Sequence, residues 1–401
     1  MKESNVIVVD SVMGSGKTTW TVNELLNKNF DENVLYVTPY LKEIDRIVEK
    51  SKRKLCEPEN HGNGKLGNIA KLLINQMDIA ATHELFRRFD RKCINALKEN
   101  EYTLILDETI SAIEPYHFTG KDDFQYLLTN NDIEVSPNGM INWVGSELDT
   151  RFDDVRILAK NQCLFKVDDK FFLWHFPHEI FHLFKKVYVL TYYFSGSLMK
   201  YYFDLYGIEY ATKSISMIDG KYALVDYYKP DKTNFRNRLK IYQGRLNSNI
   251  SQKDNVLSAT WSGNLYYKKE IEQIQKNFNN FARNIIKANS TDVMWTCYKS
   301  CKSQLMGKGY SKGFTACNCR ATNDYQDTTC LMYGINWYEN PEIKKFFARN
   351  GIAIDQDATA LSTMLQWIWR SNIRVPTSNR EINIYIPAKR MRNLLTNWLN
   401  E

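Results

Sequence analysis

The feature that most constrains this 401-residue chain is a glycine-rich turn between an apolar strand and a helix near its start. Residues 6–9 form a continuous apolar run, and residues 17–27 have a helical pattern. Between them residues 11–18 read Ser-Val-Met-Gly-Ser-Gly-Lys-Thr. Glycines let such a loop point its backbone N–H groups inward, where they and the start of the helix can bind phosphate oxygens. The sequence therefore predicts a phosphate-binding loop for a nucleotide.

Each polar side chain of this loop has an expected task. Lys17 would reach the β- and γ-phosphates of ATP, and Thr18 would place its hydroxyl on Mg²⁺. Ser11 stands where glycine is usual, and this departure bears on the geometry of the loop rather than on its chemistry. A glycine-rich turn without a ligand is the alternative, but the strand before it and the helix after it favour a nucleotide site. The residues predicted to bind the nucleotide are Gly14, Ser15, Gly16, Lys17, Thr18 and Thr19.

A pair of acidic residues follows a second apolar run, residues 103–106. Ligands of open α/β sheets bind at the carboxyl ends of the strands, which is where Asp107 and Glu108 would lie. Asp107 suits the Mg²⁺ ion, directly or through water, and Glu108 suits the attacking water as its base. The alternative is a solvated acidic pair that only ends a strand.

Strand and helix patterns alternate along the chain and predict an α/β fold with parallel sheets. Two domains are expected, 1–206 with an insertion at about 114–184, and 207–401, with a loosely patterned inter-domain region at 207–237. The predicted strands are residues 6–9, 34–37, 103–106, 187–190, 293–297, 330–333 and 382–386. The predicted helices of the second half are residues 343–348, 358–369 and 390–399.

The composition, 43% hydrophobic and 25% charged residues, is that of a globular protein. No run of about 18 apolar residues occurs, so we expect no membrane span. The eight cysteines lack the spacing of a disulfide scaffold and indicate a reducing cytoplasm. A formal charge of +7 permits a polyanionic partner without requiring one.

With these motifs the chain resembles superfamily 1 and 2 helicases, and more closely the small DExx-box helicases of superfamily 2 that bacteriophages carry. Residues 35–40 (Leu-Tyr-Val-Thr-Pro-Tyr) and 79–84 (Ile-Ala-Ala-Thr-His-Glu) look like motifs that touch the nucleic-acid backbone in that family. Residues 189–192 stand at its coupling motif, of which only Thr191 matches. The resemblance implies two RecA-like domains, with nucleic-acid contacts at Thr38, Pro39, Tyr40, Thr82 and His83.

Residues 366–374 (Gln-Trp-Ile-Trp-Arg-Ser-Asn-Ile-Arg) resemble the family's last motif. There Gln366 and an arginine finger would act on the transferring phosphoryl group, because the planar guanidinium can stabilise its charge. Arg370 and Arg374 would share a helix face with Gln366, and Arg374 is the favoured finger. An amphipathic helix with two surface arginines is the alternative.

Two further segments of the second half fall where the family contacts nucleic acid. Residues 293–299 match the first strand of a second RecA-like domain, and residues 320–327 stand at its fifth motif. Ordinary loop chemistry is the alternative for both segments. The contacts predicted from them are Thr296, Lys299, Arg320, Thr322 and Asn323.

Two metal-site patterns compete with this interpretation. His178-Glu179-Ile180-Phe181-His182 matches the HExxH zinc-protease motif, but no third ligand is evident nearby. Cys297, Cys301, Cys317, Cys319 and Cys330 cluster in the second half without the C-x-x-C unit typical of iron–sulfur sites.

The leading hypothesis is an ATP hydrolase with Mg²⁺ that acts as a helicase or translocase on nucleic acid, DNA rather than RNA, in phage replication or recombination. If the chain is phage-encoded, it would work in the host cytoplasm. The insertion would then be a strand-separating pin or a docking module for replication or recombination proteins. Two alternatives stay open: a terminase-like DNA-packaging ATPase, and an ATP-gated clamp that binds nucleic acid without unwinding it.

Overall fold

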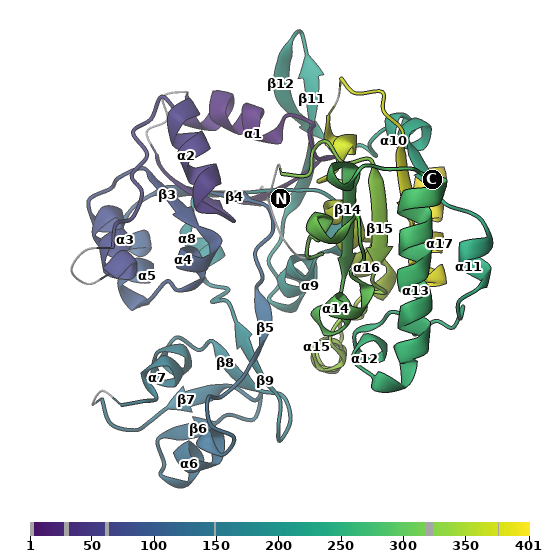
Figure 1. Cartoon of the computed structure of the whole chain (residues 1–401). Helices are drawn as coiled ribbons and strands as arrows, with labels where there is room; N and C mark the ends of the chain where they lie inside the picture. The colour runs from purple at the N-terminus through teal and green to yellow at the C-terminus, as the bar shows by residue number, and fades with distance from the viewer. Residues whose placement is uncertain (1–3, 28–31, 61–63, 148–149, 318–323, 376) are drawn as a thin grey trace. The chain divides into compact units, whose positions relative to one another are not determined.

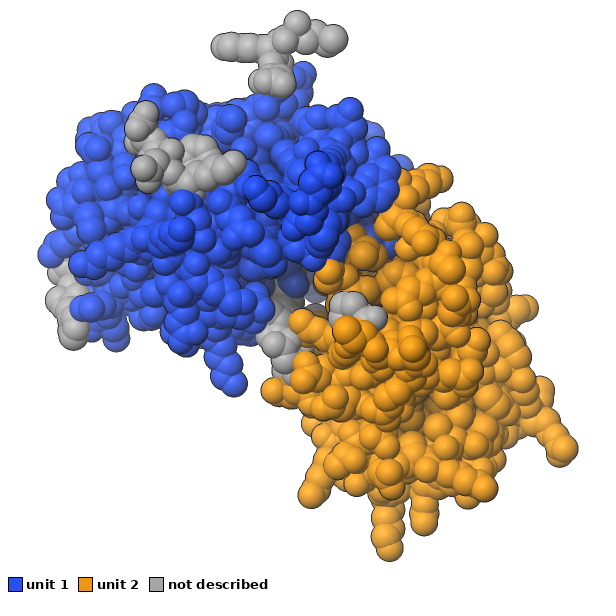
Figure 2. Space-filling model, turned by 90° about the horizontal axis from the view of Figure 1, so that it is seen from above, with its two compact units in different colours: residues 1–11, 15–228, 340–354 blue, residues 12–14, 229–339, 355–401 orange. Residues whose placement is uncertain are grey.

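The computed structural model describes the chain except residues 1–3, 28–31, 61–63, 148–149, 318–323 and 376. Its contacts divide it into two units, which Figure 2 colours separately. The first unit comprises residues 1–11, 15–228 and 340–354, and the second comprises residues 12–14, 229–339 and 355–401.

A seven-stranded sheet forms the centre of the first unit, in the order β12-β11-β1-β10-β4-β2-β3 (Figure 1). All its strands run parallel to their neighbours except β12, which is antiparallel to β11. The strands are β1 (Val6–Asp10), β2 (Asn33–Thr38), β3 (Ile79–Thr82), β4 (Tyr102–Asp107), β10 (Lys186–Thr191), β11 (Ala211–Ile218) and β12 (Lys221–Asp226).

Helices cover both faces of this sheet, so the central strands are nearly continuous apolar runs. One face packs Val8, Leu104 and Val189 into a core with helices that include α3 (Gly64–Ile74), α4 (His83–Arg87), α5 (Arg91–Glu99) and α9 (Leu198–Leu205). The other face packs Tyr36 and Ile105 against α1 (Lys17–Trp20), its π-helical continuation (Thr21–Leu26) and α2 (Leu41–Lys50). Helix α15 (Pro341–Arg349), although late in the sequence, belongs to the first of these cores.

The insertion lies between β4 and β10 and has a small core of its own, which includes Phe124, Leu127 and Phe172. It starts at β5 and returns through β9, and α8 (Ile180–Leu183) already packs Ile180 and Phe181 into the main core. Its elements are β5 (Ile113–Tyr116), α6 (Asp123–Thr129), β6 (Ile133–Val135), β7 (Ile141–Trp143), α7 (Asp153–Lys160), β8 (Leu164–Lys166) and β9 (Phe172–His175).

The second unit is built on a four-stranded, wholly parallel sheet in the order β13-β16-β15-β14. Its strands are β13 (Leu239–Ile241), β14 (Val293–Cys297), β15 (Cys330–Gly334) and β16 (Ile382–Tyr385). Its helices are α10 (Thr233–Arg238), α11 (Arg245–Ser248), α12 (Ala259–Ser262), α13 (Lys268–Asn280), α14 (Lys302–Leu305), α16 (Gln356–Ile368) and α17 (Lys389–Asn400).

The predicted fold class, α/β with two RecA-like parallel-sheet domains and an insertion in the first, is confirmed. The interpretation of residues 207–237 as an inter-domain region is wrong for its first part, because β11 and β12 pair onto the first sheet. The predicted first domain, 1–206, lacks this hairpin and residues 340–354, which the contacts assign to the first unit. Among the described residues no helix has the length and apolar character needed to span a membrane.

Candidate functional site

The carboxyl ends of three strands bring the predicted catalytic residues of the first unit together. The register pairs Asp10 of β1 with Thr191 of β10, and Leu190 of β10 with Asp107 of β4. The glycine-rich loop leaves β1 at this edge, and Glu108 follows β4 at the same edge. Two segments about ninety residues apart in the sequence therefore meet here because parallel strands end on one side.

The glycine loop turns through two left-handed residues, Gly14 with φ of 81° and Gly16 with φ of 93°. Gly16 has a second constraint, because a Cβ atom built on it would lie 2.2 Å from Cε1 of Tyr222 on β12. The carbonyl oxygen of Gly16 accepts a hydrogen bond from the backbone N–H of Trp20 at 2.8 Å, which starts α1. Sequence reasoning missed Tyr222, since nothing in the sequence indicates that the β11–β12 hairpin lies over the loop.

Lys17 is a half-buried cation whose ammonium lies in the field of three carboxylates. Its ammonium donates a hydrogen bond to the carbonyl oxygen of Ser11 at 2.5 Å. Burial lowers the pKa of Lys17 to about 8, and the charges of Asp10, Asp107 and Glu108 act in the opposite direction. A cation held away from water in this way binds a phosphate group strongly, because little solvent screens the attraction.

Two features of the loop suit a nucleotide phosphate and a metal ion. The hydroxyl of Ser15 is buried without a hydrogen-bond partner among the described residues, so the loop holds a polar atom ready for a ligand. Lys17 lies in the field of the Asp107 carboxylate, and a hard divalent cation prefers such oxygen ligands.

Asp107 is held in place by neighbouring strands. The hydroxyl of Tyr36 on β2 donates to Oδ2 of Asp107 at 2.7 Å, and Nε2 of His83 lies 3.0 Å from its carbonyl oxygen. Burial raises the pKa of Asp107, while the Tyr36 hydrogen bond and the charges of Arg46 and Lys17 oppose that rise. Sequence reasoning missed Tyr36; its place on the strand beside the acidic pair could have indicated it.

Glu108 adopts a left-handed backbone conformation, with φ of 72°. Its N–H donates to the carbonyl oxygen of Leu190 at 2.9 Å, which holds this turn against β10. For a residue other than glycine this conformation costs about 1–2 kcal/mol. Such strain is often found where a side chain must be aimed at a ligand.

Asp10 is a further member of the site that sequence reasoning did not single out. Its carboxylate accepts the backbone N–H groups of Tyr193 at 2.8 Å and Phe194 at 2.9 Å. Burial raises the pKa of Asp10, and these two hydrogen bonds and Lys17 act against it. It thereby ties the strand before the glycine loop to the turn after Thr191, where the coupling motif was predicted. An acid directly before the loop was a signal that could have revealed it.

The nucleic-acid contacts predicted in the first unit differ in exposure. Thr38 and His83 are buried, whereas Tyr40 is 39% exposed and Pro39 is half-buried. Thr82 caps α4, its hydroxyl accepting a backbone N–H from the first turn of that helix at 3.2 Å. Of these residues Tyr40 is the most exposed, and Pro39 and Thr82 are half-buried.

The predicted contacts of the second unit fall into three groups. Thr296 is fully buried in β14, and Lys299 is exposed just after that strand. Arg320, Thr322 and Asn323 lie outside the described residues.

The arginine segment is not one continuous helix, so the expectation that Arg370 and Arg374 share a helix face with Gln366 is wrong. Helix α16 ends at Ile368, and Gln366 lies in its last turn. Arg370 follows in a turn, buried, with its guanidinium donating to the carbonyl oxygen of Ala316 at 3.2 Å. Arg374 closes a separate 3₁₀ turn and is half-buried.

A buried arginine, Arg238 at the end of α10, fastens this segment. Its guanidinium donates to both oxygens of Asn372, at 2.8 Å to the carbonyl and 2.9 Å to the side chain. It also reaches the carbonyl oxygens of Ile373, Val375 and Arg380 at 3.2–3.4 Å. Sequence reasoning missed Arg238, because a buried cation that binds carbonyls has no motif.

The two metal-site patterns find no support in the described residues, which contain no group of three His, Cys, Asp or Glu side chains placed to hold an ion. In the HExxH pattern α8 begins only after Glu179, and the ring of His178 stacks on Tyr206 at 4.1 Å. In the cysteine cluster Cys297 and Cys301 are buried and Cys319 lies outside the described residues.

Comparison with known proteins assigns the chain to a family. A family model described as the YonV C-terminal Rossmann-like domain matches residues 233–399, and one described as the YonV middle domain matches residues 113–174. A Bacillus subtilis (strain 168) protein described as "SPbeta prophage-derived uncharacterized protein YonV" is 38% identical over an alignment of 413 residues, which covers 98% of this chain and 98% of that protein. The chain belongs to the YonV family. The YonV middle domain coincides with the insertion, and the C-terminal domain with most of the second unit.

Two solved structures show a distant likeness to this chain. S. tokodaii Xpd4 matches with a TM-score of 0.46 and 12% identity, over 99% of this chain and 94% of that one. The DUF1998 helicase MrfA, bound to DNA and AMPPNP, matches with a TM-score of 0.34 and 11% identity, over 100% of this chain and 49% of that one. Likenesses at this level carry nothing about activity.

Proposed function

We propose that the chain is an ATP-dependent helicase or translocase of nucleic acid that hydrolyses ATP at the carboxyl edge of the first sheet. The observation that carries this proposal is Lys17, a half-buried cation in the glycine loop that lies in the field of Asp10, Asp107 and Glu108. A cation, two left-handed glycines and an acidic pair at one sheet edge suit a nucleoside triphosphate better than any other common ligand.

In this proposal the loop binds the triphosphate through its backbone N–H groups and the buried hydroxyl of Ser15. Lys17 gives up its hydrogen bond to the Ser11 carbonyl and turns to the β- and γ-phosphates. Thr18 and Asp107 would hold the Mg²⁺ ion, which neutralises charge on the phosphates when it is bound. Tyr36 keeps the Asp107 carboxylate oriented for that task.

Glu108 orients the attacking water and takes its proton, as its position next to Asp107 suggests. Charge that develops on the transferring phosphoryl group is stabilised by Lys17 and by an arginine of the second unit. Arg374 is favoured over Arg370 for this role, because Arg370 is buried and already donates to a carbonyl oxygen of its own unit. Arg238 acts as a positioning residue for that segment.

The nucleic acid is bound through residues near the carboxyl edges of both sheets, with Tyr40 and Lys299 as the accessible candidates. DNA is favoured over RNA, since the relative's printed description as prophage-derived agrees with phage replication or recombination. A clamp that binds nucleic acid without unwinding it is the second candidate, because only Thr191 of the coupling motif matches.

The test is the ATPase rate of the full chain with single-stranded DNA, duplex DNA, forked DNA and RNA. We expect DNA to stimulate hydrolysis and Glu108→Gln to lower it by at least about 100-fold while nucleotide binding persists. Glu49→Gln, an exposed acid on α2, is the matched control and should hydrolyse at the rate of the parent protein.

No hydrolysis under any of these conditions would contradict the enzyme, and fast hydrolysis by Glu108→Gln would contradict the role of that residue. Strand displacement on the forked substrate then separates the two candidates. Hydrolysis without displacement or movement along the strand favours the clamp.

A further inference from the structure

The first unit contains a second polar site, a pocket of about 440 Å³. Its walls come from α5, from the insertion, from the segment after β9, from the end of α9 and from α15. Small-molecule sites commonly have volumes of about 300–1,000 Å³, so a nucleotide-sized group fits. None of the residues with a role in the proposed hydrolysis lines it.

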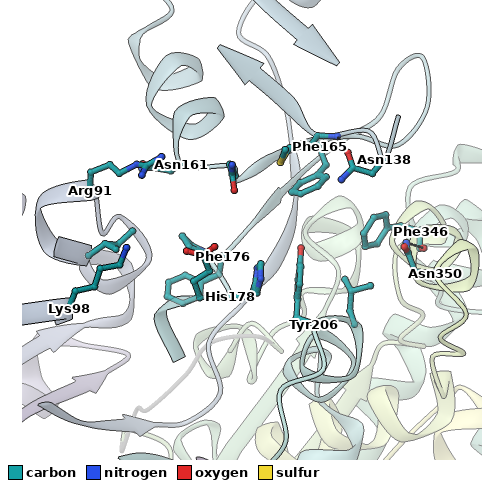
Figure 3. A pocket seen from close by; sticks show the side chains of 16 residues that line it. Arg91, Lys98, Asn138, Asn161, Phe165, Phe176, His178, Tyr206, Phe346 and Asn350 are labelled. Atoms are coloured by element: carbon teal, nitrogen blue, oxygen red, sulfur yellow. Dashed lines mark hydrogen bonds between the residues drawn. The ribbon is translucent and has the colours of Figure 1, made fainter. Parts of the chain in front are cut away.

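Figure 3 shows how the pocket's polar and aromatic side chains are distributed. Arg91 and Lys98 lie on one side and Phe346 on the opposite side, with His178 and Tyr206 between them. Arg91 and Lys98 are seven residues apart on α5, which is two helical turns, so both point from one face of that helix. The pocket therefore has a cationic end, and the rings of Phe165, His178, Tyr206 and Phe346 line the rest of it, which we term the aromatic end.

The aromatic end is held rigid by direct contacts. The rings of His178 and Tyr206 stack at 4.1 Å with an interplanar angle of 8°. The Tyr206 hydroxyl lies 2.7 Å from Nδ1 of His175, a buried ring on which Phe165 stacks at 4.2 Å. Burial lowers the pKa of His175 to about 3 and also lowers that of His178.

The rest of the lining can form hydrogen bonds without adding much charge. Asn138, Asn161 and Asn350 bring side-chain amides from three separate parts of the unit. Amides both donate and accept, as the edges of nucleobases do. Among the described residues that line the pocket, Glu179 is the single acid against Arg91 and Lys98.

We propose that this pocket binds one unpaired nucleotide of a single strand, with the base against the Phe165, Tyr206 and His178 rings and the adjoining phosphates on Arg91 and Lys98. Stacking supplies affinity for any base because every base has a π face. The two cations add a contribution to the affinity that decreases as the salt concentration rises. This inference rests on the proposed function. It extends the proposed path of the nucleic acid from the sheet edges to the insertion. The HExxH segment thereby gains a role in binding nucleic acid rather than zinc.

The test measures binding of the full chain to a fluorescent oligothymidylate and to an abasic oligonucleotide of equal length, over a range of salt concentrations. Arg91→Gln combined with Lys98→Gln should reduce the salt dependence of log K by about 1.4, which is about 0.7 for each charge removed. Lys92→Gln, an exposed cation on the same helix that does not line the pocket, should leave the salt dependence unchanged.

The aromatic end is tested by Phe165→Leu, which keeps an apolar side chain of similar size. We expect it to weaken oligothymidylate binding about tenfold and to leave abasic binding unchanged, since a base loses about 1–3 kcal/mol when its aromatic partner is removed. A thermal melt of each variant confirms that it is folded.

Unchanged salt dependence in the double variant, or equal effects of Phe165→Leu on both oligonucleotides, would overturn the pocket as a nucleotide site. The ATPase rate at saturating single-stranded DNA separates that failure from failure of the proposed function. If the variants bind DNA like the parent protein and DNA still stimulates their ATP hydrolysis, the pocket alone is rejected. If the parent protein itself does not hydrolyse ATP, the proposed function is rejected.

Discussion

Each of the two sheets has an edge at which its parallel strands end, and the chemistry of these two carboxyl edges differs. At the edge of the first sheet a half-buried lysine, Lys17, lies in the field of the carboxylates of Asp10, Asp107 and Glu108. At the edge of the second sheet Arg390 donates to the side chain of Asn336 at 3.1 Å and to the carbonyl oxygen of Trp337 at 2.7 Å.

This difference distinguishes a reactive edge from a structural one. Burial displaces the pKa values of Lys17, Asp10 and Asp107, a combination that is common where charged groups bind a ligand. At the carboxyl edge of the second sheet Arg390 instead donates to several acceptors. We infer that the first unit carries out the chemistry and that the second unit presents residues held by a fixed network.

The largest expected effect tests Arg238, which directly precedes β13 and donates to the segment before β16 at the amino edge of the second sheet. Arg238→Met should destabilise the second unit by about 3 kcal/mol, because it leaves several buried carbonyl oxygens without donors. Urea unfolding measures the loss, and a titration with a fluorescent ATP analogue should show nucleotide binding by the first unit intact. Arg245→Met, an exposed arginine on α11, is the control. Equal loss of nucleotide binding would contradict the division of roles.

The second prediction tests the glycine loop. Gly16→Ala should cost about 2 kcal/mol of stability and about tenfold in nucleotide affinity, because the left-handed backbone and the Tyr222 ring both oppose a Cβ atom. Gly207→Ala is the matched control: Gly207 has φ of 61° with open space around it, so the substitution carries the backbone cost alone.

Adding Tyr222→Ala to Gly16→Ala should restore part of the stability and no more. Thermal denaturation and nucleotide titration of the three variants give the answer. Full recovery in the double variant would show that the ring contact, rather than the backbone, is the constraint.

The third prediction concerns Asp107. Tyr36→Phe should cost about 1.5 kcal/mol at neutral pH, since a buried carboxylate loses a hydrogen bond. Burial already raises the pKa of Asp107, and the substitution should raise it further. Protonation removes the buried charge, so the difference from the parent protein should shrink as the pH falls through that pKa. Urea unfolding at several pH values measures it, with Tyr126→Phe in the insertion as control; a loss independent of pH would contradict this explanation.

The smallest expected effect is the pH dependence of nucleotide binding. Lys17 loses its proton as the pH rises through about 8 in the free protein, whereas bound phosphates would keep it charged. Binding above that pH must therefore take up a proton, and affinity should fall by up to about tenfold per pH unit. Lys17→Arg, which stays charged, should remove this slope. A slope that persists in that variant assigns the titration to another group.

The sequence predicted the first sheet's edge well because strand direction and local motifs are enough to define it. The apolar runs before Ser11 and Asp107 had to be parallel strands, so the glycine loop and the acidic pair had to end on one side. The arginine segment was predicted less well. Its helix ends at Ile368 rather than continuing to Arg374, because carbonyl contacts to Arg238 hold the chain that follows in another conformation.

The sequence by itself determined the α/β class, the strands of both sheets that carry the motifs, and the meeting of Lys17 with Asp107. These follow from local patterns whose period and spacing are set by the backbone. Only the tertiary structure decided that Tyr222 covers Gly16, that α15 packs into the first unit, and that Arg91 and Tyr206 line one pocket. Such contacts join residues far apart in the chain through side-chain packing, and packing has no periodic signal that a single sequence could reveal.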